Sequence, residues 1–257
     1  MKSTFIITFR DLNAFFKSPI LYILTAIFLI LFNYIFFNIL NFFSFQSMQA
    51  AQFQGQMGGI GLNLNDMVVQ PALHNMGVIL LLMIPLITMR SFSEEKKNKS
   101  FTLLLSSPVK LHEIVIGKFL ACFLVVTTMI SLTLISIGML FNVGEPELGP
   151  ITTSYLGMLL MASCYISVGV FASSLTDNQI VAAVMSFGFT LFMWIIGWGA
   201  QAVGADFGEL LKYLSLVDHL DPFFKGILDI GDLGYYFSFI LFGLFLTYRA
   251  LESNRWG

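Results

Sequence analysis

The sequence predicts an all-α membrane protein with six transmembrane helices. Three observations support this prediction: the composition, six long apolar stretches and the placement of the basic residues. Of the 257 residues, 57% are hydrophobic and 11% are charged, whereas a soluble domain has about 25% charged residues. This excess of apolar residues is too large for a soluble core, so a lipid bilayer is the solvent that fits the chain.

Six stretches are long and apolar enough, or nearly so, to cross a bilayer as helices, which takes about 20 residues. The second is the weakest, because its apolar core is short and contains Pro85. Only residues 176–179 join the fourth stretch to the fifth, so these two are expected to form an antiparallel hairpin. We predict spans at residues 20–40, 72–90, 114–141, 155–175, 180–203 and 233–251.

The basic residues are concentrated on one side of the predicted membrane. Of the 13 Lys and Arg residues, three lie in the N-terminal segment, six around the link between the second and third spans, and two at the C-terminus. Loops 41–71 and 142–154 contain none, and loop 204–232 contains Lys212 and Lys225. Because Lys and Arg favour cytoplasmic loops, we expect both termini in the cytoplasm.

Residues 1–18 are predicted to form a helix that lies in the membrane interface. Four apolar side chains recur at helical spacing beside a charged face, and Pro19 separates this segment from the first span. The alternative is a frayed start of the first span. The residues expected to define this helix are Phe5, Phe9, Arg10, Leu12 and Phe16.

Residues 91–113 combine a charged turn with a short apolar face and stop being helical at Pro108. Ser91 and Glu94 have the spacing of a capping box, which predicts that a helix begins here. The apolar face favours a helix docked on the cytoplasmic side, and the alternative is a solvated charge run that fixes only the topology. The third span is predicted to begin with a solvated end at Lys118.

Two further loops differ in what they indicate. Residues 204–232 are too polar to span but keep helical spacing, which predicts two short helices in the outer leaflet, with Asp221 and Pro222 at the N-cap and first position of the second. Loop 41–71 is rich in Gln, Gly, Asn and Met and predicts no clear structure.

Small residues and cysteines inside the spans predict packing. Gly169 and Ser173 stand four apart on the fourth span, and such spacing lets helices approach closely, either within the chain or across a dimer. Cys122 and Cys164 fall inside apolar runs and are expected to be buried free thiols.

Motifs for nucleotide binding and catalysis are absent from the sequence. No phosphate-binding loop of the form G-x-x-x-x-G-K-[ST] occurs. Charged residues and histidines are missing from the apolar cores of the predicted spans, whereas ion-coupled transporters need such groups at depth. The net charge of -2 gives no sign of nucleic-acid binding. We therefore expect no enzyme activity, metal or cofactor in this chain, and an energy source outside it.

The run from Pro85 to Leu105, followed by Gly117 and Lys118, resembles the coupling region of type-2 ABC transporter permeases. In that family a proline ends the membrane part of the second helix, an acidic turn and a leucine run form a coupling helix, and a Gly-Lys pair opens the third helix. Ser100 departs from the glycine that many members have. The resemblance implies that contact with the ATPase involves Arg90, Glu94, Glu95, Lys96, Ser100, Phe101, Leu104 and Leu105.

The same resemblance implies the partners. Two permease subunits, identical or different, would combine in one bilayer with two separate ATPase subunits that bind ATP and Mg, and closure of the ATPases would push on the coupling helix. Residues 213–229 and 251–256 resemble a narrower group, the gliding-motility-associated permeases and the permease for copper-site maturation of nitrous oxide reductase. This implies an exporter in the bacterial inner membrane. A second hypothesis is a mechanotransmitting subunit that moves no substrate and passes ATP-driven movement to periplasmic or other outer-side partners.

Overall fold

The computed structural model describes residues 2–53, 63–99, 109–142, 144–199 and 205–256. Within these ranges the chain forms helices and no strand. Six of the described helical stretches are long and apolar enough to cross a bilayer. The predicted all-α membrane fold with six spans is therefore confirmed.

The helices follow one another along the chain with short connections. Pro19 begins the second helix directly after the first, and α3 runs into α4 through the single residue Met89, which is itself helical. The elements are α1 Lys2–Lys17, α2 Pro19–Phe53, η1 Asn65–Val69, α3 Gln70–Thr88, α4 Arg90–Lys97, α6 Leu111–Gly138, η2 Met139–Asn142, α7 Leu148–Leu175, α8 Gln179–Gly199, α9 Ala205–Leu214, η3 Asp218–Leu220, α10 Asp221–Phe224 and α11 Ile230–Trp256.

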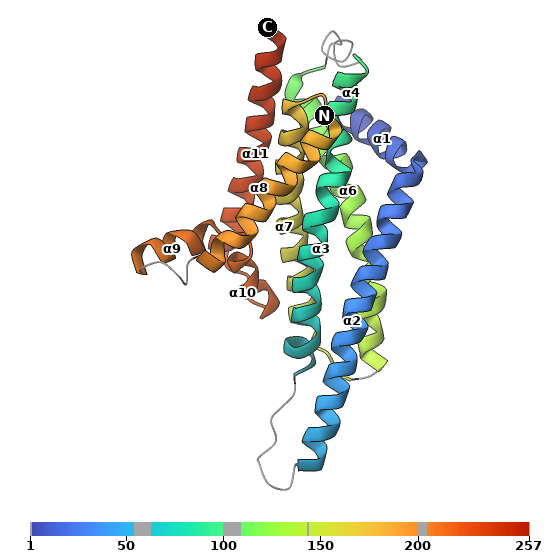
Figure 1. The fold of residues 1–257 in the computed structure, drawn as a ribbon, viewed down its shortest axis with the longest axis vertical. Helices are drawn as coiled ribbons and strands as arrows, with labels where there is room; N and C mark the ends of the chain where they lie inside the picture. The colour runs from blue at the N-terminus through green and yellow to red at the C-terminus, as the bar shows by residue number, and fades with distance from the viewer. Residues whose placement is uncertain (1, 54–62, 100–108, 143, 200–204, 257) are drawn as a thin grey trace.

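The long helices form a bundle around α7. Helix α7 packs against α3, α6, α8 and α11, and α2 lies beside α3 and α6 on the outside (Figure 1). The start of α1, the whole of α4 and the end of α11 lie at one end of the bundle, which we call the α4 end. Helices α8 and α11 diverge from the bundle axis toward α9 and α10, which lie about halfway along it.

Small residues on α7 let its neighbours approach closely. A Cβ atom added at Gly169 would lie 2.0 Å from Thr88 Oγ1 on α3, and one added at Gly157 would lie 2.9 Å from the Phe223 side chain. A Cβ atom at Gly243 on α11 would lie 2.7 Å from Ser167 Oγ. These small residues therefore serve packing within the chain. Cys122 and Cys164 are buried free thiols, as predicted.

The spans are longer than the sequence predicted at several ends. Helix α2 continues to Phe53, so the prediction that loop 41–71 has no clear structure is wrong for its first part, and η1 brings its last part into the second span. Gln, Met and Ala are good helix formers, and no Gly or Pro interrupts residues 41–53. Helix α7 begins at Leu148 and not at residue 155, because Pro150 stands in the first turn, where proline is tolerated. The fifth span is described as far as Gly199, and the last residues predicted for it lie outside the described ranges.

The predicted short helices before the last span are present as α9 and α10. Asp221 and Pro222 are the first two residues of α10 and the N-cap is Leu220, so the predicted N-cap at Asp221 is wrong. The 3₁₀ turn η3 leads directly into α10 and supplies that position. The location of these helices in the outer leaflet stays a prediction.

Aromatic residues and one histidine fix this region to the start of α11. The His219 ring stacks on Tyr235 at 4.0 Å between centroids, and its Nδ1 lies 2.6 Å from the Asp232 carboxylate. The Tyr236 hydroxyl donates a hydrogen bond to the Leu216 carbonyl oxygen at 2.8 Å. We call His219, Asp232, Tyr213, Tyr235 and Tyr236 the His219 cluster.

Candidate functional site

Helix α4 is a direct continuation of α3 that is fixed to α7. The Ser173 hydroxyl of α7 donates to the Met89 carbonyl oxygen at 2.9 Å. The same hydroxyl accepts hydrogen bonds from the backbone N–H groups of Phe92 at 3.0 Å and Ser93 at 3.1 Å. The predicted capping box at Ser91 is wrong, because Ser91 lies inside a continuous helical run and no free helix end exists there. Ser173 thus joins the end of the second span to the fourth.

Helix α1 lies across the start of α6, where Gly117 allows close contact. A Cβ atom at this position would lie 2.9 Å from Ile7 Cγ2 and 3.2 Å from the Thr4 carbonyl oxygen. The Thr8 hydroxyl donates to the Gly117 carbonyl oxygen at 3.1 Å. Any side chain at Gly117 would push α1 away from α6, so this glycine sets the position of α1.

Lys118 is buried, with 3% of its side chain exposed. Its ammonium donates to the Ser91 carbonyl oxygen at 2.6 Å and lies 3.2 Å from Asp11 Oδ2 and 3.0 Å from Glu95 Oε1. The ring of Phe92 lies beneath it at 5.1 Å. The predicted solvated end is therefore wrong, because two carboxylates, one from α1 and one from α4, compensate the buried charge.

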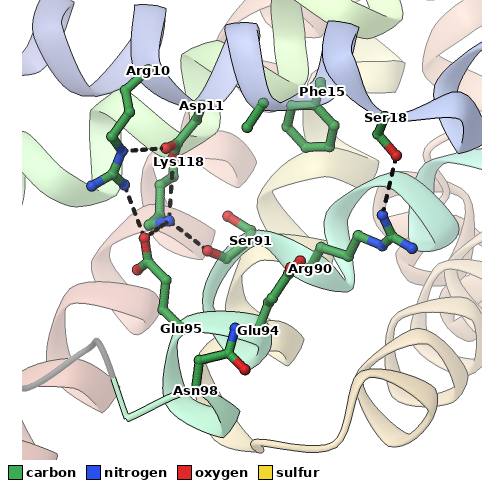
Figure 2. A pocket seen from close by; sticks show the side chains of 11 residues that line it. Arg10, Asp11, Phe15, Ser18, Arg90, Ser91, Glu94, Glu95, Asn98 and Lys118 are labelled. Carbon is green, nitrogen blue, oxygen red and sulfur yellow. Dashed lines mark hydrogen bonds and ion pairs between the residues drawn. The ribbon is translucent and has the colours of Figure 1, made fainter.

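Arg10 completes this group of charges on the side facing solvent. Its guanidinium lies 2.8 Å from Asp11 Oδ1 and 2.9 Å from Glu95 Oε1. Partial burial by itself would lower the pKa of Arg10. The hydrogen bond and negative charge of Asp11, together with the charge of Glu95, outweigh burial, so the pKa lies above its ordinary value. We call Arg10, Asp11, Glu95 and Lys118 the ion cluster; it joins α1, α4 and α6 (Figure 2).

The sequence-predicted coupling residues divide into two groups in the described part of the chain. Glu95 belongs to the ion cluster, and the Lys96 ammonium donates to the Ser174 carbonyl oxygen at the end of α7. Glu94 is exposed, and Arg90 is partly buried, with Nη1 3.5 Å from Ser18 Oγ. Ser100, Phe101, Leu104 and Leu105 lie outside the described residues.

The predicted helix at residues 1–18 is confirmed as α1. Its apolar face is directed away from the bundle, since Phe5, Phe9 and Phe16 are exposed and Leu12 is partly buried. The opposite face carries Arg10 and Asp11 into the ion cluster. An exposed aromatic face suits a lipid environment, and the location in the membrane interface stays a prediction.

Sequence reasoning missed the roles of Asp11, Ser173 and Lys118. A charge four residues inside an apolar run was the available signal for Lys118, because such a group needs a partner once it is buried. The contact between Asp11 and Lys118 spans 107 residues of sequence, and no local pattern indicates it. Ser173 looks like any small residue of a span, and its neighbours in sequence give no signal for its hydrogen bonds.

The arrangement joins helices mechanically. The described residues contain no group of three or more His, Cys, Asp or Glu side chains that could hold a metal ion. Each member of the ion cluster contacts another charged member across a helix boundary, so displacement of α4 must act on α1 and α6.

Comparison with known proteins identifies the family. The family model described as "ABC-2 family transporter protein" matches residues 5–245, which is nearly the whole chain. No curated protein matches the chain. The matched region runs from α1 into the sixth span and includes the ion cluster. The chain therefore belongs to the ABC-2 transporter family and is a multi-pass membrane permease subunit of an ABC transporter.

Proposed function

We propose that a separate ATPase drives this permease by binding at α4 and at the residues that follow it. The observation that carries the proposal is that α4 is fixed to three other helices, to α7 by Ser173 and to α1 and α6 by the ion cluster. A rigid helix attached in this way passes a movement of the ATPase into the second, third and fourth spans.

The distribution of charge supports a cytoplasmic location for the α4 end. The ion cluster, the exposed Lys97, the start of α1 and the end of α11 all lie there. This end therefore carries more Lys and Arg residues than the other end of the bundle. An ATPase that uses cytoplasmic ATP would meet α4 on that side. We therefore propose that both termini are cytoplasmic and that the membrane is the bacterial inner membrane.

The finer assignment rests on sequence resemblance. Residues 213–229 and 251–256 resemble the gliding-motility-associated permeases, so we propose an exporter of that group, which forms a homodimer or a heterodimer with a second permease. The permease for copper-site maturation of nitrous oxide reductase is the alternative within the same resemblance.

One observation favours mechanotransmission as a second candidate function. A cavity of about 450 Å³ between α7, α8 and α11 is lined almost entirely by apolar side chains, among them Phe171, Phe189 and Phe239. Such a cavity offers no polar path for a hydrophilic cargo. A subunit that passes movement to outer-side partners needs no such path.

The coupling proposal is tested by co-expressing the chain with an ABC ATPase subunit from the same genome. We expect Phe101→Ala, and Leu104→Ala combined with Leu105→Ala, to reduce co-purification or to uncouple ATP hydrolysis, because each change removes apolar surface that a partner would bury. Glu94→Ala should have a smaller effect that depends on salt.

The control for these variants is Lys225→Ala, which removes an exposed charge that follows α10 and lies outside the proposed ATPase-binding segment. Membrane insertion and thermal stability of every variant are measured in parallel. If the apolar variants assemble and hydrolyse ATP like the parent chain, the segment does not contact the ATPase and the proposal is wrong.

A further inference from the structure

A polar pocket opens beside the ion cluster, between α1, α4 and the start of α6. Its volume is about 480 Å³, which is enough for a small polar headgroup. Figure 2 shows the ion cluster on one side of it and Arg90, which reaches toward Ser18, on the other. It is lined by Arg10, Asp11, Ala14, Phe15, Ser18, Arg90, Ser91, Glu94, Glu95, Asn98 and Lys118.

The charges of the residues lining this pocket balance overall, but two of them have no ion-pair partner among the described residues. Arg10 and Lys118 pair with Asp11 and Glu95. The remaining pair of opposite charges, Arg90 and Glu94, forms no ion pair within 4.0 Å in the part of the chain that the structure describes. The pocket therefore presents one uncompensated cation and one uncompensated anion.

Arg90 needs an anion most clearly. Its Nε is buried and has no hydrogen-bond partner within the described ranges. Its Nη1 lies 3.5 Å from Ser18 Oγ, which is beyond the ordinary length of a hydrogen bond. A buried N–H group of a guanidinium without an acceptor is unfavourable, and a phosphate oxygen is the acceptor that the planar guanidinium fits best.

An apolar groove shares this arginine. The groove lies between α2 and α3, and Phe15, Ser18 and Arg90 line both it and the polar pocket. Ile20 and Leu86 are exposed there, on surfaces of spanning helices where lipid is the solvent. The remaining lining residues are Leu21, Leu24 and Ile87. The groove itself has a volume of only about 20 Å³, which is too small for an acyl chain. A lipid with its phosphate at Arg90 would therefore lay its chains over the exposed apolar surface of α2 and α3.

Glu94 defines the rest of the headgroup. It follows Arg90 by four residues, so the two side chains lie one turn apart on the same face of α4. In a phosphoethanolamine headgroup a two-carbon bridge separates the phosphate from a primary ammonium, which matches a cation and an anion one turn apart. We propose that this site binds a zwitterionic phospholipid of the phosphatidylethanolamine type, with its phosphate on Arg90 and Ser18 and its ammonium toward Glu94 and Asn98.

Native mass spectrometry of the purified full chain in mild detergent tests the proposal. The probes are phosphatidylethanolamine, phosphatidylcholine and phosphatidylglycerol with identical acyl chains, titrated separately. We expect the ethanolamine lipid to bind most tightly, and Arg90→Gln to weaken it about tenfold, because a charge-assisted hydrogen bond is lost. Glu94→Gln should remove the preference for ethanolamine over the anionic glycerol lipid. Lys97→Gln, which removes an exposed charge of the same helix outside the pocket, should bind like the parent.

Free phosphoethanolamine, added as a competitor, distinguishes a lipid from a soluble ligand. If free phosphoethanolamine displaces the bound lipid weakly or not at all, the result supports a lipid site. If it displaces the lipid at the same concentration at which the lipid binds, the proposal is overturned. Equal binding of all three lipids, or unchanged binding by Arg90→Gln, would also overturn the proposal. If Arg90→Gln fails to fold, Glu94→Gln still decides the matter through headgroup preference. No ATPase takes part in these measurements, so their outcome is independent of the coupling proposal.

Discussion

The two regions that fix helices to the bundle use different chemistry. At the α4 end, the ion cluster surrounds a lysine that is 3% exposed, and each charge depends on the others. At the start of α11, the His219 cluster combines ring stacking and hydrogen bonds to backbone carbonyl oxygens with a single contact to a carboxylate, that of Asp232. Loss of one member leaves buried charge uncompensated in the first region, whereas most contacts survive in the second. The comparison predicts that the α4 end is cooperative and that the α9–α10 region tolerates single changes better.

The largest effect is expected from Lys118→Met. The substitution leaves the carboxylates of Asp11 and Glu95 without their buried partner, and breaking a buried ion pair in this way costs about 3–5 kcal/mol of stability. Thermal unfolding of the purified chain in detergent measures the loss. Lys97→Met is the control, since Lys97 is exposed on α4. Equal unfolding temperatures for the two variants would contradict the cooperative description of the α4 end.

An intermediate effect is expected from Gly117→Ala. The added methyl group would lie 2.9 Å from Ile7 Cγ2 and 3.2 Å from the Thr4 carbonyl oxygen, so α1 must move. Overpacking of this kind costs about 1–3 kcal/mol. Gly138→Ala is the control on the same helix, because a Cβ atom there meets nothing within 4 Å.

Limited proteolysis and thermal unfolding distinguish the two glycine variants. The Gly117 variant should release α1 to protease, whereas the Gly138 variant should match or slightly exceed the parent, because Ala favours helix over Gly. The idea that Gly117 positions α1 fails if both variants behave alike.

The smallest effect is expected from His219→Gln. The two ring nitrogens of His219 lie 2.6 Å from the Asp232 carboxylate and 2.9 Å from the Tyr213 carbonyl oxygen, and the shorter amide of glutamine cannot keep both contacts. We expect a loss of about 1 kcal/mol, because one hydrogen bond is lost while aromatic contacts among the tyrosines remain. Thermal unfolding measures this loss of stability, and His112→Gln, a change at an exposed histidine, is the control. A loss as large as that of Lys118→Met would remove the distinction between the two regions.

The spans could be predicted from sequence because a bilayer imposes its requirement locally. A helix needs enough consecutive apolar residues, and residues 20–40 or 114–141 satisfy that without reference to the rest of the chain. The ends were less predictable, since polar residues such as those at 41–53 continue a helix when nothing stops it. The family resemblance drew on the same local runs and was confirmed at the family level.

The candidate site could be predicted only in part, because its contacts join segments far apart in sequence. The sequence predicts that Glu95 contacts the ATPase, whereas in the structure its carboxylate contacts Arg10, which is 85 residues away in sequence. Lys118 was predicted to reach water, because it lies only four residues inside the predicted span and a long side chain near a span end usually extends to solvent. Its burial became possible only when α1 brought Asp11 beside it.

The length of α2 has a geometric consequence. Its 35 residues extend roughly 52 Å at about 1.5 Å per residue, well beyond a hydrocarbon core of about 30 Å. The helix begins at Pro19, next to the pocket beneath α4. If α2 pivots at that end by about 10°, its far end sweeps an arc of roughly 9 Å, because displacement grows with the radius of about 52 Å. A small rotation at the α4 end would thus become a displacement of roughly 9 Å at the far end of α2, which is large enough to open or close a contact with another protein.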